Sequence, residues 1–197
     1  MRSIVASVLT ASCLVALDSA AYDGISLGLG LEYNPIARLE YGNNSQPGQD
    51  VVDNITLEPG IYIGFANGLR VGGFFTRYSK SLERGDNRTS SLSAWGIGFS
   101  GDYGLEITES GKTQLAGGIE AGYSELTDKN EFNKRTRGGI WVAAIGGIRH
   151  FINRAIFLEM NFRMKWLEYD FPETPQKSYD YSGPVLRISL GYGVYAL

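Results

Sequence analysis

The sequence contains very few of the residues on which catalysis and metal binding usually depend. It has one cysteine and one histidine among 197 residues. A single cysteine excludes a disulfide framework and a thiolate-held zinc ion, and a single histidine leaves almost no means of building a metal site or an acid–base triad. Eighteen basic against 21 acidic side chains give a formal net charge of −3, which argues against binding to nucleic acid. We therefore expect no metal, no cofactor and no nucleic-acid partner.

Long apolar runs are also missing, except at the start of the chain. Met1 and Arg2 precede an apolar run over residues 4–17, and small residues follow at 19–21. This order is typical of a secretory signal peptide, which we predict over residues 1–21. Cys13 lies within it, so the mature chain would have no cysteine. After residue 21 no stretch approaches the roughly 18 apolar residues of a membrane-spanning helix, which excludes a helical membrane protein but not a β-barrel.

Glycine and aromatic residues are abundant instead. There are 26 glycines, about twice the usual share, with 12 tyrosines, nine phenylalanines and three tryptophans. Large apolar residues alternate with glycine, serine and charged residues, and such a period of two predicts β-strands with one apolar face. The alternation predicts eight strands, at about 25–33, 55–65, 69–75, 95–107, 115–123, 139–150, 156–166 and 186–194.

Two positions disturb the alternation. Pro59 cannot donate a ladder hydrogen bond, so we expect a bulge there. In the 139–150 segment the apolar Trp141 and Ile145 fall on the polar parity, which predicts a bulge or a change of phase.

The connections between the predicted strands alternate between short and long. Short turns lie at 66–68, 109–112 and 151–154, and long polar stretches lie at about 34–53, 79–91, 125–138 and 170–183. This alternation predicts an all-β fold over residues 22–197, an eight-stranded antiparallel up-and-down transmembrane β-barrel. Both termini would be periplasmic, and four long loops would be outside the cell.

The composition of the two strand faces predicts their surroundings. Glycine shares a parity with the charged residues, as expected if long polar side chains occupy a narrow lumen while the apolar parity meets lipid. Six acids and five bases are close to the neutrality that pairing away from water requires. Because about eight strands leave room only for side chains, we expect a packed polar lumen. The predicted lumen charges are Glu32, Glu58, Asp102, Glu106, Glu120, Glu159, Arg70, Arg149, Arg163, Lys165 and Arg187.

Aromatic residues gather near the predicted strand ends, as in the girdles at the two lipid–water boundaries. Those of the outer rim are Tyr33, Phe75, Tyr78, Trp95, Tyr123, Trp166 and Tyr181, and those of the inner rim are Phe65, Tyr103, Phe151 and Tyr192. A basic cluster in the third long loop could contact lipopolysaccharide phosphates or an acidic surface partner. It consists of Lys129, Lys134, Arg135 and Arg137.

These features, with the glycine- and aromatic-rich last strand at 190–195, resemble the small outer-membrane barrels grouped with the OmpA transmembrane domain, OmpX and the opacity proteins. The chain departs from that group by ending in Ala196-Leu197, where an aromatic residue is usual. The resemblance implies a monomeric, non-enzymatic protein of the Gram-negative outer membrane. Its partners would be outer-membrane lipid, lipopolysaccharide and possible surface or host ligands, and its role would be adhesion, recognition or envelope integrity.

Three other functions remain open. A narrow porin-like channel would conduct small solutes. A lipid A-modifying enzyme of the deacylase type would need a serine two residues after its histidine, whereas Ile152 occupies that position after His150. A soluble lipocalin-like carrier would need bulky apolar residues on the glycine-rich parity. Residues 96–101 match the dinucleotide motif G-x-G-x-x-G, but no helix is expected after them.

Overall fold

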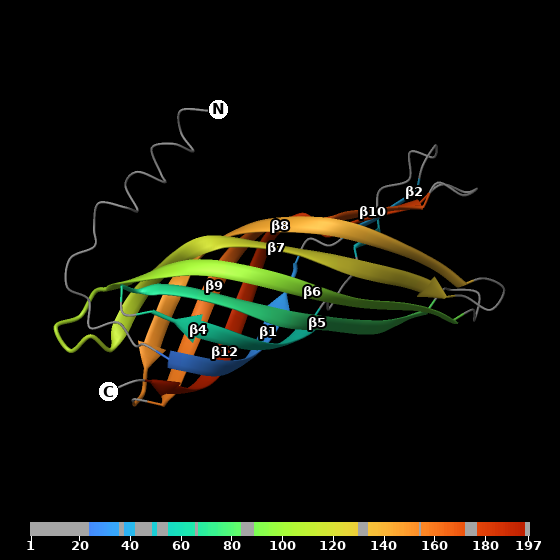
Figure 1. Cartoon of the computed structure of the whole chain (residues 1–197). Helices are drawn as coiled ribbons and strands as arrows, with labels where there is room; N and C mark the ends of the chain where they lie inside the picture. The colour runs from blue at the N-terminus through green and yellow to red at the C-terminus, as the bar shows by residue number, and fades with distance from the viewer. Residues whose placement is uncertain are drawn as a thin grey trace, which may run out of the picture.

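The computed structural model describes residues 24–35, 38–41, 49–50, 55–65, 67–83, 89–129, 134–153, 155–171 and 177–195. The predicted signal peptide lies outside these ranges. The described residues form a closed barrel and a four-stranded sheet at one end of it (Figure 1). In this part of the chain no helix is long and apolar enough to cross a membrane.

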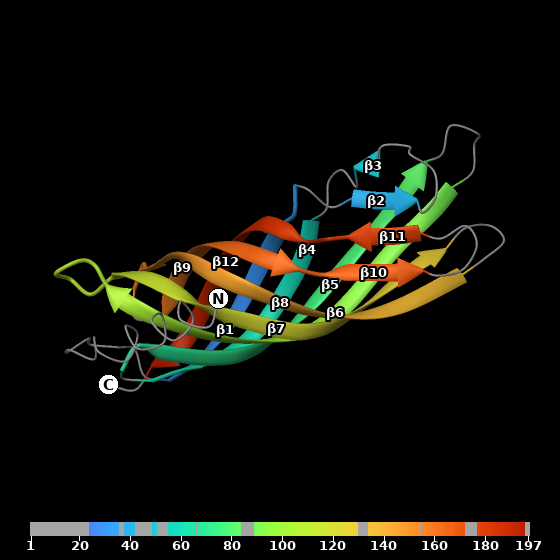
Figure 2. The ribbon, with the colours of Figure 1, turned by 90° about the horizontal axis from the view of Figure 1, so that it is seen from above.

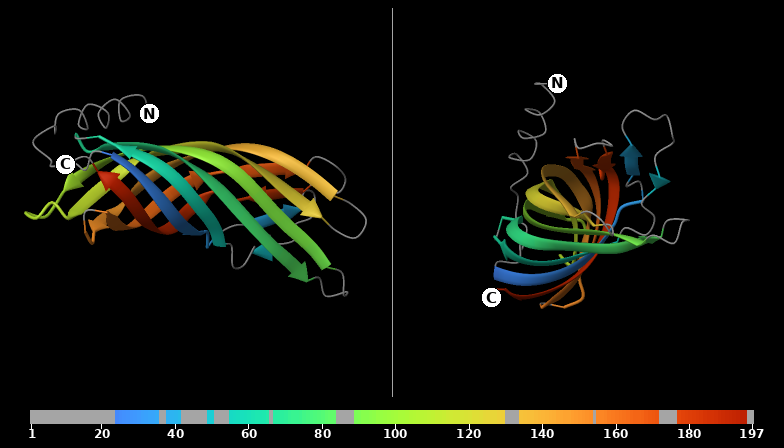
Figure 3. Two further views of the ribbon diagram at one scale, coloured as in Figure 1. Left: turned by 60° about the horizontal axis from the view of Figure 1, so that its bottom comes forward. Right: turned by 90° about the vertical axis from the view of Figure 1, so that its right-hand side faces the viewer.

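The barrel has eight antiparallel strands, which confirms the predicted fold class. Strands β1 and β12 close it, with Gly24 opposite Tyr195 and Tyr33 opposite Leu186, so the chain enters and leaves the barrel at the same end (Figure 3). That end also carries the short turns. The barrel strands are β1 (Gly24–Tyr33), β4 (Ile55–Gly64), β5 (Leu69–Glu83), β6 (Thr89–Glu106), β7 (Thr113–Lys129), β8 (Lys134–Phe151), β9 (Ile156–Trp166) and β12 (Gly183–Tyr195).

Two of the four predicted long loops are largely strands, and the other two are strands in part. Strands β5 and β6 continue through most of 79–91, and β7 and β8 continue through most of 125–138. Most of the second sheet lies in the other two predicted loops, and its order is β10-β11-β2-β3 (Figure 2). Its strands are β2 (Arg38–Tyr41), β3 (Gln49–Asp50), β10 (Glu168–Phe171) and β11 (Lys177–Asp180).

Pairing between neighbouring barrel strands stops at two seams where these additions begin. Pairing between β8 and β9 ends at Val142 opposite Trp166, and pairing between β4 and β5 ends at Leu57 opposite Arg77. Beyond the seams the chain continues as two sheets. We call residues 77–83, 89–95, 125–129 and 134–138 the β5–β8 extension, and the sheet β10-β11-β2-β3 the small sheet.

Large apolar side chains change from the outward to the inward face of the strands between the barrel and the β5–β8 extension. Within the barrel, apolar side chains such as Ile97 and Phe162 point outward, with 47% and 64% of their surfaces exposed. In the β5–β8 extension large apolar side chains point inward instead, and Leu92 and Leu126 are fully buried. They form one core with residues of the small sheet and the segment that follows it, including Tyr169, Phe171, Tyr179 and Tyr181. The two sheets therefore face each other across an ordinary hydrophobic core.

Neither predicted bulge is present. The outward-facing Pro59 lies opposite Leu29, and β4 keeps one register with β5 at Leu57 and at Gly60, on either side of the proline. Strand β8 keeps one register with β7 throughout, so Trp141 simply points into the lumen. A Cβ atom at Gly98 or Gly122 would lie 2.7 Å from its indole ring, so these two glycines provide the space that Trp141 occupies.

Candidate functional site

Ten charged side chains meet in the barrel lumen, and every strand of the barrel contributes at least one. None is more than 9% exposed. The five acids come from five strands, and the five bases come from four. They are Glu32 (β1), Glu58 (β4), Arg70 (β5), Asp102 (β6), Glu120 (β7), Arg149 (β8), Glu159, Arg163 and Lys165 (β9) and Arg187 (β12).

Glu106 was predicted to lie in the lumen with these residues but does not join them. It is half-buried at the end of β6, and its Oε1 atom has no hydrogen-bond partner among the described residues. Without Glu106 the lumen holds five acids and five bases. The network is therefore formally neutral, as burial of ionised groups requires.

Toward the short turns, four charges form a closed ring of alternating sign. Arg70 Nε lies 2.8 Å from Asp102 Oδ2, and Asp102 Oδ1 lies 2.6 Å from Arg149 Nη2. Arg149 Nε lies 2.7 Å from Glu159 Oε2, which is also 2.9 Å from Arg70 Nη2. Each guanidinium thus bridges the same two carboxylates. Because such charge-assisted hydrogen bonds are directional, the ring fixes four strands relative to one another.

Toward the small sheet, Arg163 is the centre of a second group. Its guanidinium donates to Glu32, to Glu58 Oε1 at 2.8 Å and to Glu120 Oε1 at 2.9 Å. Lys165 Nζ lies 3.0 Å from Glu32 Oε1, and Arg187 Nε lies 2.9 Å from Glu58 Oε2. All three acids on Arg163 come from different strands, so this group ties β9 to β1, β4 and β7.

Aromatic rings fill the space between the charges. The Arg70 guanidinium lies 4.6 Å from the ring centre of Tyr62, and Lys165 Nζ lies 4.9 Å from that of Trp141. Two cavities, of about 20 and 30 Å³, lie on either side of the network. Each has room for a water molecule or two but not for a larger solute. The lumen is a packed polar core.

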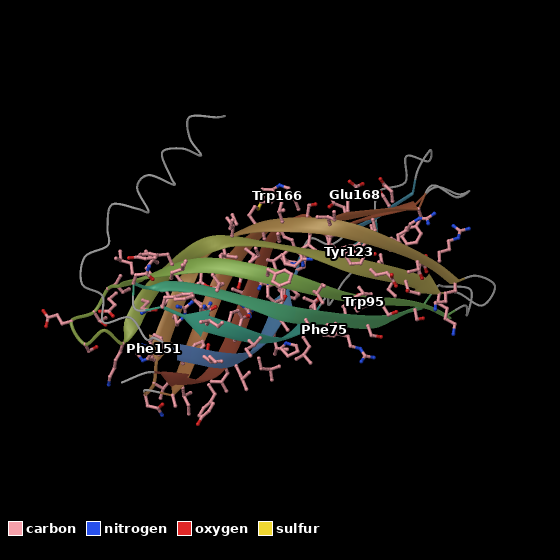
Figure 4. The ribbon with its side chains drawn as sticks, in the orientation of Figure 1. Phe75, Trp95, Tyr123, Phe151, Trp166 and Glu168 are labelled. Carbon is pink, nitrogen blue, oxygen red and sulfur yellow. The ribbon has the colours of Figure 1, made fainter. Side chains whose placement is uncertain are left out.

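The aromatic residues predicted at the rims divide into two groups. Those on the outward parity are exposed, except for the half-buried Tyr103: Tyr33, Phe65, Phe75, Trp95, Tyr123, Trp166 and Tyr192. Figure 4 shows Phe75, Trp95 and Tyr123 on neighbouring strands, with Phe151 toward the opposite end. Tyr78, Tyr181 and Phe151 were predicted at the rims but are buried, because they lie on the inward parity.

The predicted basic cluster lies on strands, so alternation separates its members. Lys129 and Lys134 are opposite each other and exposed on the outer face of the β5–β8 extension. Arg135 and Arg137 lie on the inner face, where the Arg137 guanidinium is 5.9 Å from the Phe171 ring centre. The four residues therefore do not form one basic surface.

The core between the β5–β8 extension and the small sheet was not predicted from the sequence. Its tyrosines contact polar groups on β7: the hydroxyls of Tyr169 and Ser124 are 2.5 Å apart, and the Tyr179 hydroxyl donates to Asp128 Oδ2 at 3.0 Å. Burial raises the pKa of Tyr169 to about 12. The available signal was the continued period of two with its apolar parity reversed, as in Leu92 between Ser91 and Ser93.

His150 is on the outer surface of the barrel, near a short turn. Its Nδ1 atom lies 2.9 Å from Thr113 Oγ1, and the neighbouring Ile152 is exposed. Within the described ranges, no group of histidine, cysteine, aspartate or glutamate residues is placed to hold a metal ion.

The same fold occurs in solved outer-membrane proteins. Neisserial surface protein A has a TM-score of 0.60 and 12% sequence identity, over 88% of this chain and 99% of that one. OprG of Pseudomonas aeruginosa has a TM-score of 0.57 and 12% identity, over 89% and 98%. Ail, the attachment invasion locus protein of Yersinia pestis, has a TM-score of 0.53 and 13% identity, over 87% and 99%. No protein-family model and no curated protein matches the sequence. The chain thus has the fold of the small eight-stranded outer-membrane barrels.

Proposed function

We propose that the protein is a non-enzymatic barrel of the Gram-negative outer membrane that holds a rigid two-sheet structure outside the cell. The short-turn end, with both termini, would face the periplasm. The outer structure would serve adhesion, recognition or envelope integrity. Strands occupy most of two of the four long loops predicted from the sequence and parts of the other two.

The observation that carries this proposal is the inside-out distribution of polarity in the barrel. Large apolar side chains such as Phe99, Ile119 and Ile140 have 67%, 72% and 80% of their surfaces exposed, while ten charges are sealed within. In water, an apolar surface around the whole barrel would drive aggregation, whereas lipid tails are a favourable environment for it. Two proteins with this fold, Neisserial surface protein A and the attachment invasion locus protein Ail, are named for the cell surface or for attachment and invasion, which supports a role at the surface.

The proposal is tested by matched arginine substitutions. An arginine at the centre of the lipid-facing surface costs about 2–4 kcal/mol, and the cost falls to about 0–1 kcal/mol near the membrane interfaces. Ile119→Arg should therefore reduce insertion into bilayers, measured as the fraction of protein that migrates as a folded species without boiling. Ser93→Arg, on the outer face of the β5–β8 extension, should insert like the unmodified protein. Equal insertion of the two variants, or recovery of the protein outside the outer-membrane fraction of cells, would contradict the proposal.

The packing of the lumen bears most directly on the channel alternative. The ion-paired network leaves space for water only, so we expect no steady conductance for solutes in planar bilayers. Reproducible unitary currents that change in Arg163→Ala would favour the channel instead. Mass spectrometry of lipid A from cells with and without the protein tests the enzymatic alternative, and we expect identical spectra.

A further inference from the structure

The outer face of the β5–β8 extension carries a regular row of hydroxyl groups. Ser79 lies opposite Ser93, Ser93 opposite Thr127, and Thr127 opposite Thr136, so the row crosses all four strands. Thr127 Oγ1 and Thr136 Oγ1 are 3.1 Å apart. The row thus presents donors and acceptors at the regular spacing of a β-sheet, about 4.8 Å.

Cations flank this hydroxyl row. Lys129 and Lys134 form the next outward row on β7 and β8, directly opposite each other, and both are exposed. Arg77 is exposed in the row on the barrel side, where Glu125 accepts a hydrogen bond from Trp95. Among the described residues, the two lysines have no ion-pair partner. Two like charges placed side by side repel each other, and a bound anion would remove that repulsion.

The face is continuous with the lipid-facing surface of the barrel. The last apolar row on these strands contains Phe75, Ile97, Tyr123 and Ile140, and the hydroxyl row begins four residues further along each strand. Four residues span about 13 Å. Groups at that distance, beside the extension, would belong to the layer just outside the acyl chains of the outer leaflet.

We propose, on the basis of the outer-membrane placement proposed above, that this face binds the phosphorylated core sugars of lipopolysaccharide in the protein's own membrane. Sugar hydroxyls would pair with the serine and threonine row, and a core phosphate would lie between Lys129 and Lys134. The small sheet covers the inner face of the extension, so the outer face is the one left open to the surrounding leaflet. A phosphorylated sugar satisfies both the uncharged hydroxyls and the paired cations, whereas a protein surface would be expected to meet apolar residues as well.

The test uses the full barrel refolded in detergent micelles and three lipopolysaccharide probes: lipid A alone, lipid A with a phosphorylated core, and the same core after dephosphorylation. Binding is followed by the rise in the unfolding temperature. We expect the phosphorylated core to bind more tightly than lipid A alone, and dephosphorylation to remove part of that gain. Lys129→Gln/Lys134→Gln should weaken binding of the phosphorylated core by roughly fivefold to tenfold, because two exposed charge interactions with the phosphate are lost.

Lys112→Glu is the matched control, because it changes the net charge by the same −2 on an exposed turn at the opposite end of the barrel. It should bind all three probes like the unmodified protein. Thr127→Val/Thr136→Val removes hydroxyls without removing charge and should weaken binding of both cores. If lipid A and the two cores bind equally, or if the lysine pair and Lys112→Glu behave alike, the assignment of this face is wrong. The outer-membrane proposal would fail separately, through loss of bilayer insertion.

Discussion

Arg163 is the residue on which most of the lumen network depends. It donates to three carboxylates on three other strands and is 2% exposed. Removing one partner of a buried ion pair leaves an uncompensated charge, which typically costs 3–5 kcal/mol. We therefore expect Arg163→Met to lower the free energy of unfolding by about that amount, measured by urea unfolding in micelles.

Glu120→Gln is the informative comparison for Arg163→Met. Glu120 contributes one oxygen to Arg163, and its second carboxylate oxygen has no hydrogen-bond partner among the described residues. Its amide analogue can keep the observed bond through its carbonyl oxygen. The loss of stability should be clearly smaller than in Arg163→Met. Equal losses would mean that the lumen tolerates an unpaired carboxylate, and the importance assigned to Arg163 would be wrong.

Tyr169 provides a pH-dependent signal in the core beside the small sheet. Burial raises its pKa from 10.0 to about 12. A group whose pKa is raised on folding favours the folded state below its unfolded pKa, and this contribution is lost as the pH rises through the folded value. Packing of the small sheet should therefore be unaffected below about pH 10 and weaken from there toward pH 12. Near-ultraviolet circular dichroism of the tyrosines measures this, and the signal in Tyr169→Phe should fall less steeply over that interval.

At the scale of a strand, β8 shows how the two faces differ in their tolerance of larger side chains. Gly146 and Gly147 are neighbours on opposite faces. A Cβ atom at Gly147 would overlap the backbone oxygen of Met160, whereas a Cβ at Gly146 meets no atom within 4 Å. Gly147→Val should destabilise the barrel by about 1–3 kcal/mol, the usual range for overpacking. Gly146→Val should be neutral or stabilising, because it adds an apolar group toward lipid. Similar unfolding free energies for the two variants would contradict the assignment of the faces.

The sequence was sufficient to predict the barrel strands but not their length. Within the barrel, apolar residues outside and charged residues inside give an alternation that is visible without a structure. In the β5–β8 extension both faces change together: polar side chains replace most of the apolar ones outside, and a hydrophobic core replaces the polar lumen inside. The period of two continues through Leu126, Thr127 and Asp128, but its apolar parity is reversed, so a search for outward apolar residues ends too early.

The composition of the lumen was predictable, but its arrangement was not. Parity alone places Glu32 and Arg163 on the inward face. Which acid pairs with which base depends on the register between strands and on the reach of each side chain, and Arg163 and Glu32 are 131 residues apart in sequence. Parity also fails at strand ends, where Glu106 leaves the network. The prediction of one basic cluster was wrong for a simpler reason. It assumed a loop at residues where β7 and β8 continue, and the side chains of a strand alternate between its two faces.

At the scale of the molecule, the proposed orientation predicts which surfaces a reagent can reach in intact cells. Asp170 is exposed on the small sheet, and Ser110 is exposed on a short turn at the other end. If the two ends lie on opposite sides of the outer membrane, Asp170→Cys should react with a membrane-impermeant maleimide in intact cells. Ser110→Cys should react only after permeabilisation. The reverse result would mean that the barrel has the opposite orientation in the membrane.

Because the lumen charges are spread over all eight strands, the network also enforces the number of strands. A partial barrel that lacks β12 would have no Arg187, and its remaining charges would be five acids against four bases. A slipped register would separate partners that now meet within hydrogen-bond distance. Incomplete or misaligned assemblies would therefore bury unpaired charge and be selectively unstable, so arrival of the last strand would convert a strained intermediate into the finished barrel in one cooperative step.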